Sequence, residues 1–277
     1  MKFNSIEVVP GNPALGMLLN FEDPQGTSPY QVLDIEGLDT GELMKSYYAR
    51  GQSSGMKFFN FSLPRREPTI KVGLTPRPGV NETVSSLRDD IYRLISSSRD
   101  GTIFIKFMDD ATEVAVLTGT ISGVEPALFE KRPTVDIRLE CDDPLLRASD
   151  LIELDLTDST TNEIAFYDPY STAPHGLYFI ATFQEEAKNL TIDDGTNDWF
   201  FTITPKDGFD KGDELWFIGE ANTRGLYRIR KGESYSLADA VAQNSVWPIV
   251  FPLSNEFMFN RELDFALVGH RPSYWGV

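Results

Sequence analysis

The stretch PTVDIRLECDDPLLR, residues Pro133–Arg147, decides how the chain is divided. In its VDIRLE part, apolar and charged residues alternate with a period of two, which predicts a half-buried β-strand. The strand must end at the Asp-Asp-Pro turn, because Pro144 has no N–H group to donate to a β-ladder. A chain of 277 residues is long enough for two domains. We therefore predict two domains, residues 1–147 and residues 148–277.

The first predicted domain is β-rich and contains one helix. Alternating apolar residues predict strands such as Glu113–Val124. Before this strand, apolar residues recur at helical spacing and predict a helix over residues 81–96, with Asn81 as its N-cap and Glu82 in its first turn. Short turns join most of the strands, which favours an antiparallel sheet or small barrel with the helix packed on it.

A long segment of weak periodicity, residues 37–56, interrupts the first domain. It contains the polar-aromatic sequence SYYAR and the flexible sequence GQSSG. A segment longer than a hairpin turn within a compact domain commonly has a function or is ordered by a partner. We expect an arm that reaches a neighbouring subunit, with Leu38, Tyr47, Tyr48 and Arg50 as candidate interface residues.

The second predicted domain is all-β. Its short strands are separated by turns, a pattern typical of a β-sandwich. All four tryptophans lie in this half of the chain. Exposed aromatic rings can stack on sugars, and Trp199 and Trp216 are candidates for such a site. Aromatic side chains serve a sandwich core or a subunit interface equally well.

The charge of the chain argues against two classes of partner. The net charge of −17 divides into −6 for residues 1–150 and −11 for residues 151–277. A field of this sign repels nucleic-acid phosphates and anionic lipid headgroups. We therefore expect neither nucleic acid nor a membrane as a partner. The single cysteine, Cys141, excludes an intramolecular disulfide, and we expect it to be buried as a small apolar residue.

Acidic residues in two neighbouring turns are weak candidates for a Ca²⁺ site, because carboxylate oxygens are hard ligands. Their spacing lacks the EF-hand pattern, and Asp is also a common residue in turns. These acids are Asp193, Asp194 and Asp198 in the first turn, and Asp207, Asp210 and Asp213 in the second. Only two histidines are present, His175 and His270, which argues against a His-ligated zinc site or a Ser-His-Asp triad.

No enzymatic motif stands out. The sequence contains no P-loop, no dinucleotide-binding glycine pattern, no GxSxG and no HExxH. A glycosidase needs one pair of carboxylates at a set separation, and 42 acidic residues give no means of choosing such a pair. We predict that the protein is not an enzyme and uses no cofactor.

The order of several segments resembles the distal tail proteins of siphophages, the bacteriophages with long non-contractile tails. In the first half these segments are IEGLD before the arm, the helix VSSLRDDIYRLIS, the strands IFIKF and EVAVLTGTISGV, and VDIRLECDDPLLR. In the second half they are VWPIVFPLSNEFMF and the terminal GHRPSYWGV. The resemblance extends over nearly the whole chain.

This resemblance implies a fold and a function. The first domain would be a β-barrel with one helix that assembles as a homo-hexameric ring, with Trp275 as a further interface residue. The second would be a galectin-like β-sandwich. The ring would join the tail tube protein to the tail-tip hub protein and offer docking sites for receptor-binding proteins or side fibres. The protein would be assembled in the host cytoplasm and reside at the virion tail tip. The alternative is a carbohydrate-binding module that acts in adhesion to the host surface.

Overall fold

The computed structural model describes residues 3–10, 16–21, 27–39, 44–49, 56–62, 64–97, 101–110, 112–127, 132–156, 159–195, 199–220 and 223–276. For residues 44–49 and 56–62 it describes the backbone only. The described chain is mainly β with one α-helix, as the sequence predicted. None of its helices is long and apolar enough to cross a membrane.

The chain divides into two compact units. The first comprises Met1–Ser149 together with Trp275–Val277, and the second comprises Asp150–Tyr274. The predicted second domain, residues 148–277, differs from the second unit because the end of the chain packs on the first unit. There, Arg66 Nη2 donates a hydrogen bond to the Trp275 carbonyl oxygen.

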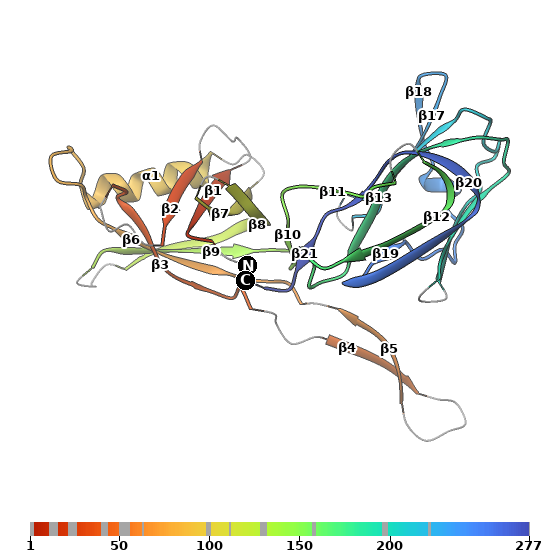
Figure 1. Cartoon of the computed structure of the whole chain (residues 1–277). Helices are drawn as coiled ribbons and strands as arrows, with labels where there is room; N and C mark the ends of the chain where they lie inside the picture. Colours follow the sequence, from red (N-terminus) through yellow and green to blue (C-terminus); the bar gives the residue numbers. More distant parts are fainter. Residues whose placement is uncertain are drawn as a thin grey trace. The chain divides into compact units, whose positions relative to one another are not determined.

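Seven strands of the first unit close into a barrel (Figure 1). The two end strands of the path, β8 and β9, pair with each other and so complete the ring of strands. Only β2 and β3 pair in parallel along this path. The order is β8 (Thr112–Ala127), β7 (Thr102–Asp109), β1 (Ser5–Pro10), β2 (Met17–Asn20), β3 (Tyr30–Glu36), β6 (Thr69–Leu74) and β9 (Thr134–Glu140).

Strand β9 is the strand predicted from the alternating stretch. Val135, Ile137 and Leu139 are each at most 1% exposed and point into the barrel. The turn that follows is held by Asp143, which accepts a hydrogen bond from the backbone N–H of Leu145 and pairs with Arg147 at 2.7 Å. The short strand β10 (Leu146–Arg147) then pairs with β8.

Helix α1 (Val84–Ser96) begins later than predicted. Its N-cap is Thr83, not Asn81, and a capping box fixes this start: the Ser86 N–H donates to the Thr83 hydroxyl oxygen, and the Thr83 N–H donates to the Ser86 hydroxyl oxygen. Glu82 lies outside the helix, because its carboxylate accepts hydrogen bonds from the side chain and backbone N–H of Arg77. Glu82 therefore binds Arg77 and does not belong to the first turn of the helix.

The apolar side of α1 packs on the barrel. Leu87, Ile91 and Leu94 recur at helical spacing and are each at most 5% exposed. The Tyr30 hydroxyl of β3 reaches the helix and lies 3.4 Å from an Asp90 carboxylate oxygen. Burial, reinforced by the negative charge of Asp90, raises the pKa of Tyr30 to about 12. Tyr30 is therefore a neutral hydrogen-bond donor that ties β3 to α1.

The predicted arm, residues 37–56, contains a strand. β4 (Met44–Ala49) pairs antiparallel with β5 (Met56–Ser62) to form a two-stranded sheet separate from the barrel. The sequence SYYA lacks a clean apolar–polar alternation, which is why it did not predict a strand. The arm thus includes one strand of a hairpin, and its remaining parts at residues 40–43 and 50–55 lie outside the described residues.

The second unit is built on one long strand, β20 (Leu253–His270), within a curled sheet. The first part of β20 pairs with β14, and its second part pairs with β13. The sheet order is β15 (Trp199–Ile203), β14 (Leu190–Asp194), β20, β13 (His175–Phe183), β16 (Glu214–Ile218), β17 (Gly225–Arg230) and β18 (Glu233–Ser236). Further pairings add β11 (Ile152–Glu153) and β12 (Ser159–Asp168) to β20, and β19 (Ile249–Val250) to β13.

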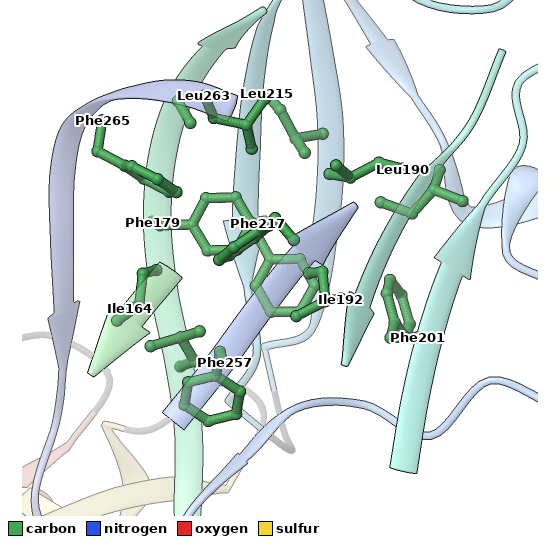
Figure 2. Close-up of a cluster of buried hydrophobic side chains, with 14 of the residues drawn as sticks. Ile164, Phe179, Leu190, Ile192, Phe201, Leu215, Phe217, Phe257, Leu263 and Phe265 are labelled. Atoms are coloured by element: carbon green, nitrogen blue, oxygen red, sulfur yellow. The ribbon is translucent and has the colours of Figure 1, made fainter. Parts of the chain in front are cut away.

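Phenylalanine fills the core of the second unit (Figure 2). The rings of Phe179 and Phe217 stack with centroids 4.9 Å apart and planes 3° from parallel. Phe259 and Phe265 meet the Phe179 ring edge-on at 5.6 and 5.8 Å. Stacked and edge-on aromatic contacts each stabilise the fold beyond the area that they bury.

We predict that Gly176→Ala destabilises the second unit. A Cβ atom at Gly176 of β13 would lie 2.2 Å from the backbone carbonyl carbon of Gly219 and 2.3 Å from the backbone nitrogen of Glu220, so backbone atoms would have to shift. We expect the free energy of unfolding in urea to fall by about 2–3 kcal/mol. The control is Gly123→Ala in β8, where a Cβ atom meets nothing within 4 Å. Equal unfolding curves for the two variants would contradict the close approach.

Candidate functional site

A row of large side chains crosses the outward face of the second unit's sheet. Trp216 of β16 stands opposite Ile180 of β13 on one side and opposite Tyr227 of β17 on the other. Ile180 in turn stands opposite Leu267 of β20. Directly opposed residues share one face of a sheet, so these four side chains lie in one line across four strands. We call Leu267, Ile180, Trp216 and Tyr227 the aromatic row.

The alternation of β16 explains why this row faces outward. Leu215 and Phe217 are fully buried in the core, so Trp216 between them must point to the other face. Trp216 is 38% exposed and Tyr227 is 39% exposed. The indole N–H of Trp216 donates a hydrogen bond to Glu214 Oε1, which orients the ring. Trp216 and Tyr227 therefore form the exposed part of a candidate binding surface.

The two predicted sugar-binding tryptophans are not brought together. Trp199 of β15 shares its side of the strand with the buried residues Phe201 and Ile203, and its ring lies 6.2 Å from that of Phe251. Trp216 lies on the outward face. Tyr227, which does stand beside Trp216, was missed. It could have been found from the two short alternating segments 214–218 and 225–230, read as a hairpin.

The first acidic turn does not gather its carboxylates. Asp193 and Asp194 are neighbours in β14 and point to opposite faces, so Asp193 is exposed and Asp194 is buried. Two adjacent strand residues therefore cannot direct their carboxylates at one cation. Asp198, the third candidate in this turn, lies outside the described residues.

The second acidic turn holds arginine side chains. Arg230 contacts the carboxylates of Asp207, Asp210 and Asp213 at 3.0, 3.2 and 2.6 Å. Arg228 contacts Asp207 at 2.9 Å. The guanidinium groups occupy the space between the acids, so this turn is an ion-pair network in which the cation is supplied by the chain itself.

Asp213 is the buried member of this network. Its burial alone would raise the pKa of its carboxyl group, but hydrogen bonds from Arg230 and from the backbone N–H of Asp210 outweigh burial and lower the pKa below its usual range. Asp213 is therefore ionised at neutral pH and anchors Arg230.

The two histidines lie next to each other in the second unit, together with Asp168. His175 Nε2 lies 2.9 Å from His270 Nδ1, and Asp168 Oδ2 lies 3.7 and 3.9 Å from these two nitrogens. All three side chains are at most 1% exposed. Asp168 and His270 are 102 positions apart, and the three residues meet because each lies at the end of a strand. The number of histidines in the sequence does not reveal this proximity.

The predicted interface residues fall into two groups. Leu38 is buried within the first unit at 7% exposure, and the partly buried Trp275 offers its carbonyl oxygen to Arg66. Both therefore serve the packing of this chain. Tyr47 and Tyr48 belong to β4, where only the backbone is described, and Arg50 lies outside the described residues.

Comparison with solved structures finds a similar fold in a phage protein. The SPP1 Dit protein (gp 19.1) is described as a paradigm of the hub adsorption apparatus in phages that infect Gram-positive bacteria. It matches with a TM-score of 0.60 at 15% identity, over 97% of this chain and 98% of that chain. The chain has the fold of SPP1 Dit. The sequence resemblance to distal tail proteins is thereby confirmed at the level of the fold.

Two chains from structures of the phage p2 baseplate in its activated conformation, with Sr and with Ca, also show similarity to this chain. They are 6% and 8% identical to this chain and cover 98% and 100% of it, and likewise 98% and 100% of their own lengths. Their TM-scores of 0.44 and 0.47 are too low to support an argument. No family model and no curated protein matches the chain.

We predict that Asp213→Asn lowers the free energy of unfolding by about 1.5–3 kcal/mol at neutral pH, since it weakens buried charge-assisted hydrogen bonds. Because the pKa of Asp213 is lowered in the folded state, its contribution is present above the ordinary Asp pKa of about 3.9 and is lost as the pH falls through the lowered value. Urea titrations at several pH values measure both effects. Asp239→Asn, at an exposed position, is the control. A loss that does not diminish in acid would contradict this account.

Proposed function

We propose that the chain is a structural component of a phage tail that forms a homo-hexameric ring between the tail tube and the tail-tip hub. The observation that carries this proposal is the match to SPP1 Dit, which extends over nearly the full length of both chains. The sequence resemblance to distal tail proteins supplies the hexameric ring and the neighbours on either side of it. The proposal assigns the chain no enzymatic step and no cofactor.

The hairpin of β4 and β5 supports contact between subunits. It forms a two-stranded sheet of its own, separate from the barrel sheet. An isolated two-stranded hairpin is marginally stable in water, so a third strand or a packed surface is needed to hold it. In a ring, a neighbouring subunit supplies that surface.

The aromatic row supports docking on the second unit. Its aliphatic members, Ile180 and Leu267, and its aromatic members, Trp216 and Tyr227, make an apolar surface with polar neighbours, which is the composition of a protein–protein interface core. We propose that receptor-binding proteins or side fibres dock here. In this role the protein resides at the virion tail tip and is assembled in the host cytoplasm.

A carbohydrate-binding function is the second candidate, and the exposed Trp216 and Tyr227 rings favour it. Aromatic rings side by side on a sheet face can stack on a sugar, and Glu214 beside Trp216 can accept hydrogen bonds from sugar hydroxyls.

The proposed ring predicts the mass of the purified protein. We expect native mass spectrometry of the full chain, alone or with the hub protein, to show six times 31.1 kDa. Replacing residues 44–62 with a short Gly-Ser linker should reduce the assembly to monomers, while circular dichroism keeps the β signature of both units. A strict monomer for the unmodified chain, with and without the hub protein, would argue against the ring.

The carbohydrate alternative predicts a single site on the outward face. If it holds, Trp216→Ala should abolish binding on a glycan array, while Trp199→Ala, on the other side of the sheet, should leave binding unchanged. No binding by the unmodified chain at millimolar sugar would remove this alternative and leave protein docking as the function of the aromatic row.

A further inference from the structure

Three strand ends meet in the interior of the second unit. Asp168 ends β12, His175 begins β13 and His270 ends β20. His270 stands opposite Leu177 of β13 and Ile152 of β11, which places it at the segment where the chain enters and leaves this unit. The three polar side chains are buried among apolar strands, and the tail function proposed above makes no use of them.

The three nearest atoms form a small triangle. Its sides are 2.9 Å between His175 Nε2 and His270 Nδ1, and 3.7 and 3.9 Å from these atoms to Asp168 Oδ2. A triangle with these sides has a centre about 2.1 Å from each corner, which matches Zn–N and Zn–O bonds of about 2.0–2.2 Å. A cation at this centre would therefore lie at bonding distance from all three atoms.

Neighbouring groups orient each of these atoms inward. His175 Nδ1 lies 3.2 Å from the Ala173 carbonyl oxygen, which can only accept, so Nδ1 carries the proton and Nε2 presents its lone pair. The Asp168 carboxylate is held through Oδ1, which accepts hydrogen bonds from the backbone N–H groups of Tyr170 and Ser171. The ring of His270 stacks on Phe166 at 5.1 Å.

One atom of the cluster has no hydrogen-bond partner among the described residues. Asp168 Oδ2 is buried and accepts no hydrogen bond, and the whole Asp168 side chain is shielded from solvent. The other carboxylate oxygen, Oδ1, accepts two backbone hydrogen bonds. A buried carboxylate oxygen without a donor or cation is costly, and a bound metal ion removes that cost.

We propose that Asp168, His175 and His270 bind a divalent transition metal, Zn²⁺ by preference, as a structural site. Imidazole nitrogen together with carboxylate oxygen is a donor set that suits Zn²⁺. Binding requires that His270 carry its proton on Nε2, so that Nδ1 is free to coordinate. The metal would pin the ends of β12, β13 and β20, and because the ligands are buried it would enter as the unit folds. This site is independent of the proposed tail function.

The alternative is a metal-free pair in which His270 Nδ1–H donates to His175 Nε2. The separation of 2.9 Å between these nitrogens fits a hydrogen bond as well as two ligands of one ion. The alternative leaves Asp168 Oδ2 unpaired, which the metal site does not.

The metal content of the refolded chain distinguishes the metal site from the metal-free histidine pair. The full chain, without a polyhistidine tag, is unfolded with EDTA and refolded with equimolar Zn²⁺ or Co²⁺. We expect one metal ion per chain by elemental mass spectrometry, visible absorption bands typical of imidazole-bound Co²⁺, and a higher midpoint of thermal unfolding with Zn²⁺. No retained metal and no Co²⁺ spectrum in the unmodified chain would overturn the proposal.

Variants locate the site. Asp168→Asn keeps the oxygen that accepts from Tyr170 and Ser171 and replaces only the inward oxygen, so it should fold and lose more than about 100-fold in metal affinity. His270→Gln should also lose the metal. Asp239→Asn and Cys141→Ser, which removes the only thiol, should retain it. Equal metal binding by Asp168→Asn and the unmodified chain would overturn the proposal. If His270→Gln does not fold, the Co²⁺ spectrum of the unmodified chain still decides whether imidazole binds the metal.

Discussion

The pairing of β8 with β9 is the interaction on which the first unit depends. Residues Thr120–Ala127 of β8 lie opposite Thr134–Glu140 of β9, and this contact joins the two ends of the strand path into a closed barrel. Closure gives each barrel strand a partner on both sides, which removes the exposed edges that favour aggregation. The same pairing buries the apolar side of β9, while α1 covers part of the barrel through Leu87, Ile91 and Leu94. A rigid body of this kind suits a component that must hold its shape within a larger assembly.

In the second unit, β20 has the corresponding role. Its two parts pair with different neighbours, so one continuous strand links β14 at one end to β13 and β11 at the other. Alternation along the strands then sends phenylalanine rings inward and the aromatic row outward. Since β20 ends at His270, it also delivers one of the three buried polar side chains to the point where β12 ends and β13 begins. The outward surface and the buried cluster are thus consequences of one strand arrangement.

Local patterns predicted much of the fold. The alternation in VDIRLE predicted β9, and the helical spacing of apolar residues predicted α1, because burial on one side imposes those periods. The start of α1 was missed, since Arg77 binds Glu82 and leaves Thr83 to cap the helix. The Trp216–Tyr227 pair could have been found by reading segments 214–218 and 225–230 as a hairpin. The rest of the aromatic row and the histidine cluster could not be predicted, because they depend on strand register and on residues far apart in the sequence. His175 and His270 are 95 positions apart, and no local pattern marks their meeting.

We propose that the barrel forms a ring, that the hairpin of β4 and β5 lies against a neighbouring copy, and that the aromatic row is a docking surface. Electron cryomicroscopy of the assembled phage particle tests this claim most directly. We expect six copies of the chain in one ring between the tail tube and the tail-tip hub, with β4 and β5 of each copy against the next. Absence of the chain from the particle, or its presence elsewhere without ring symmetry, would contradict the account.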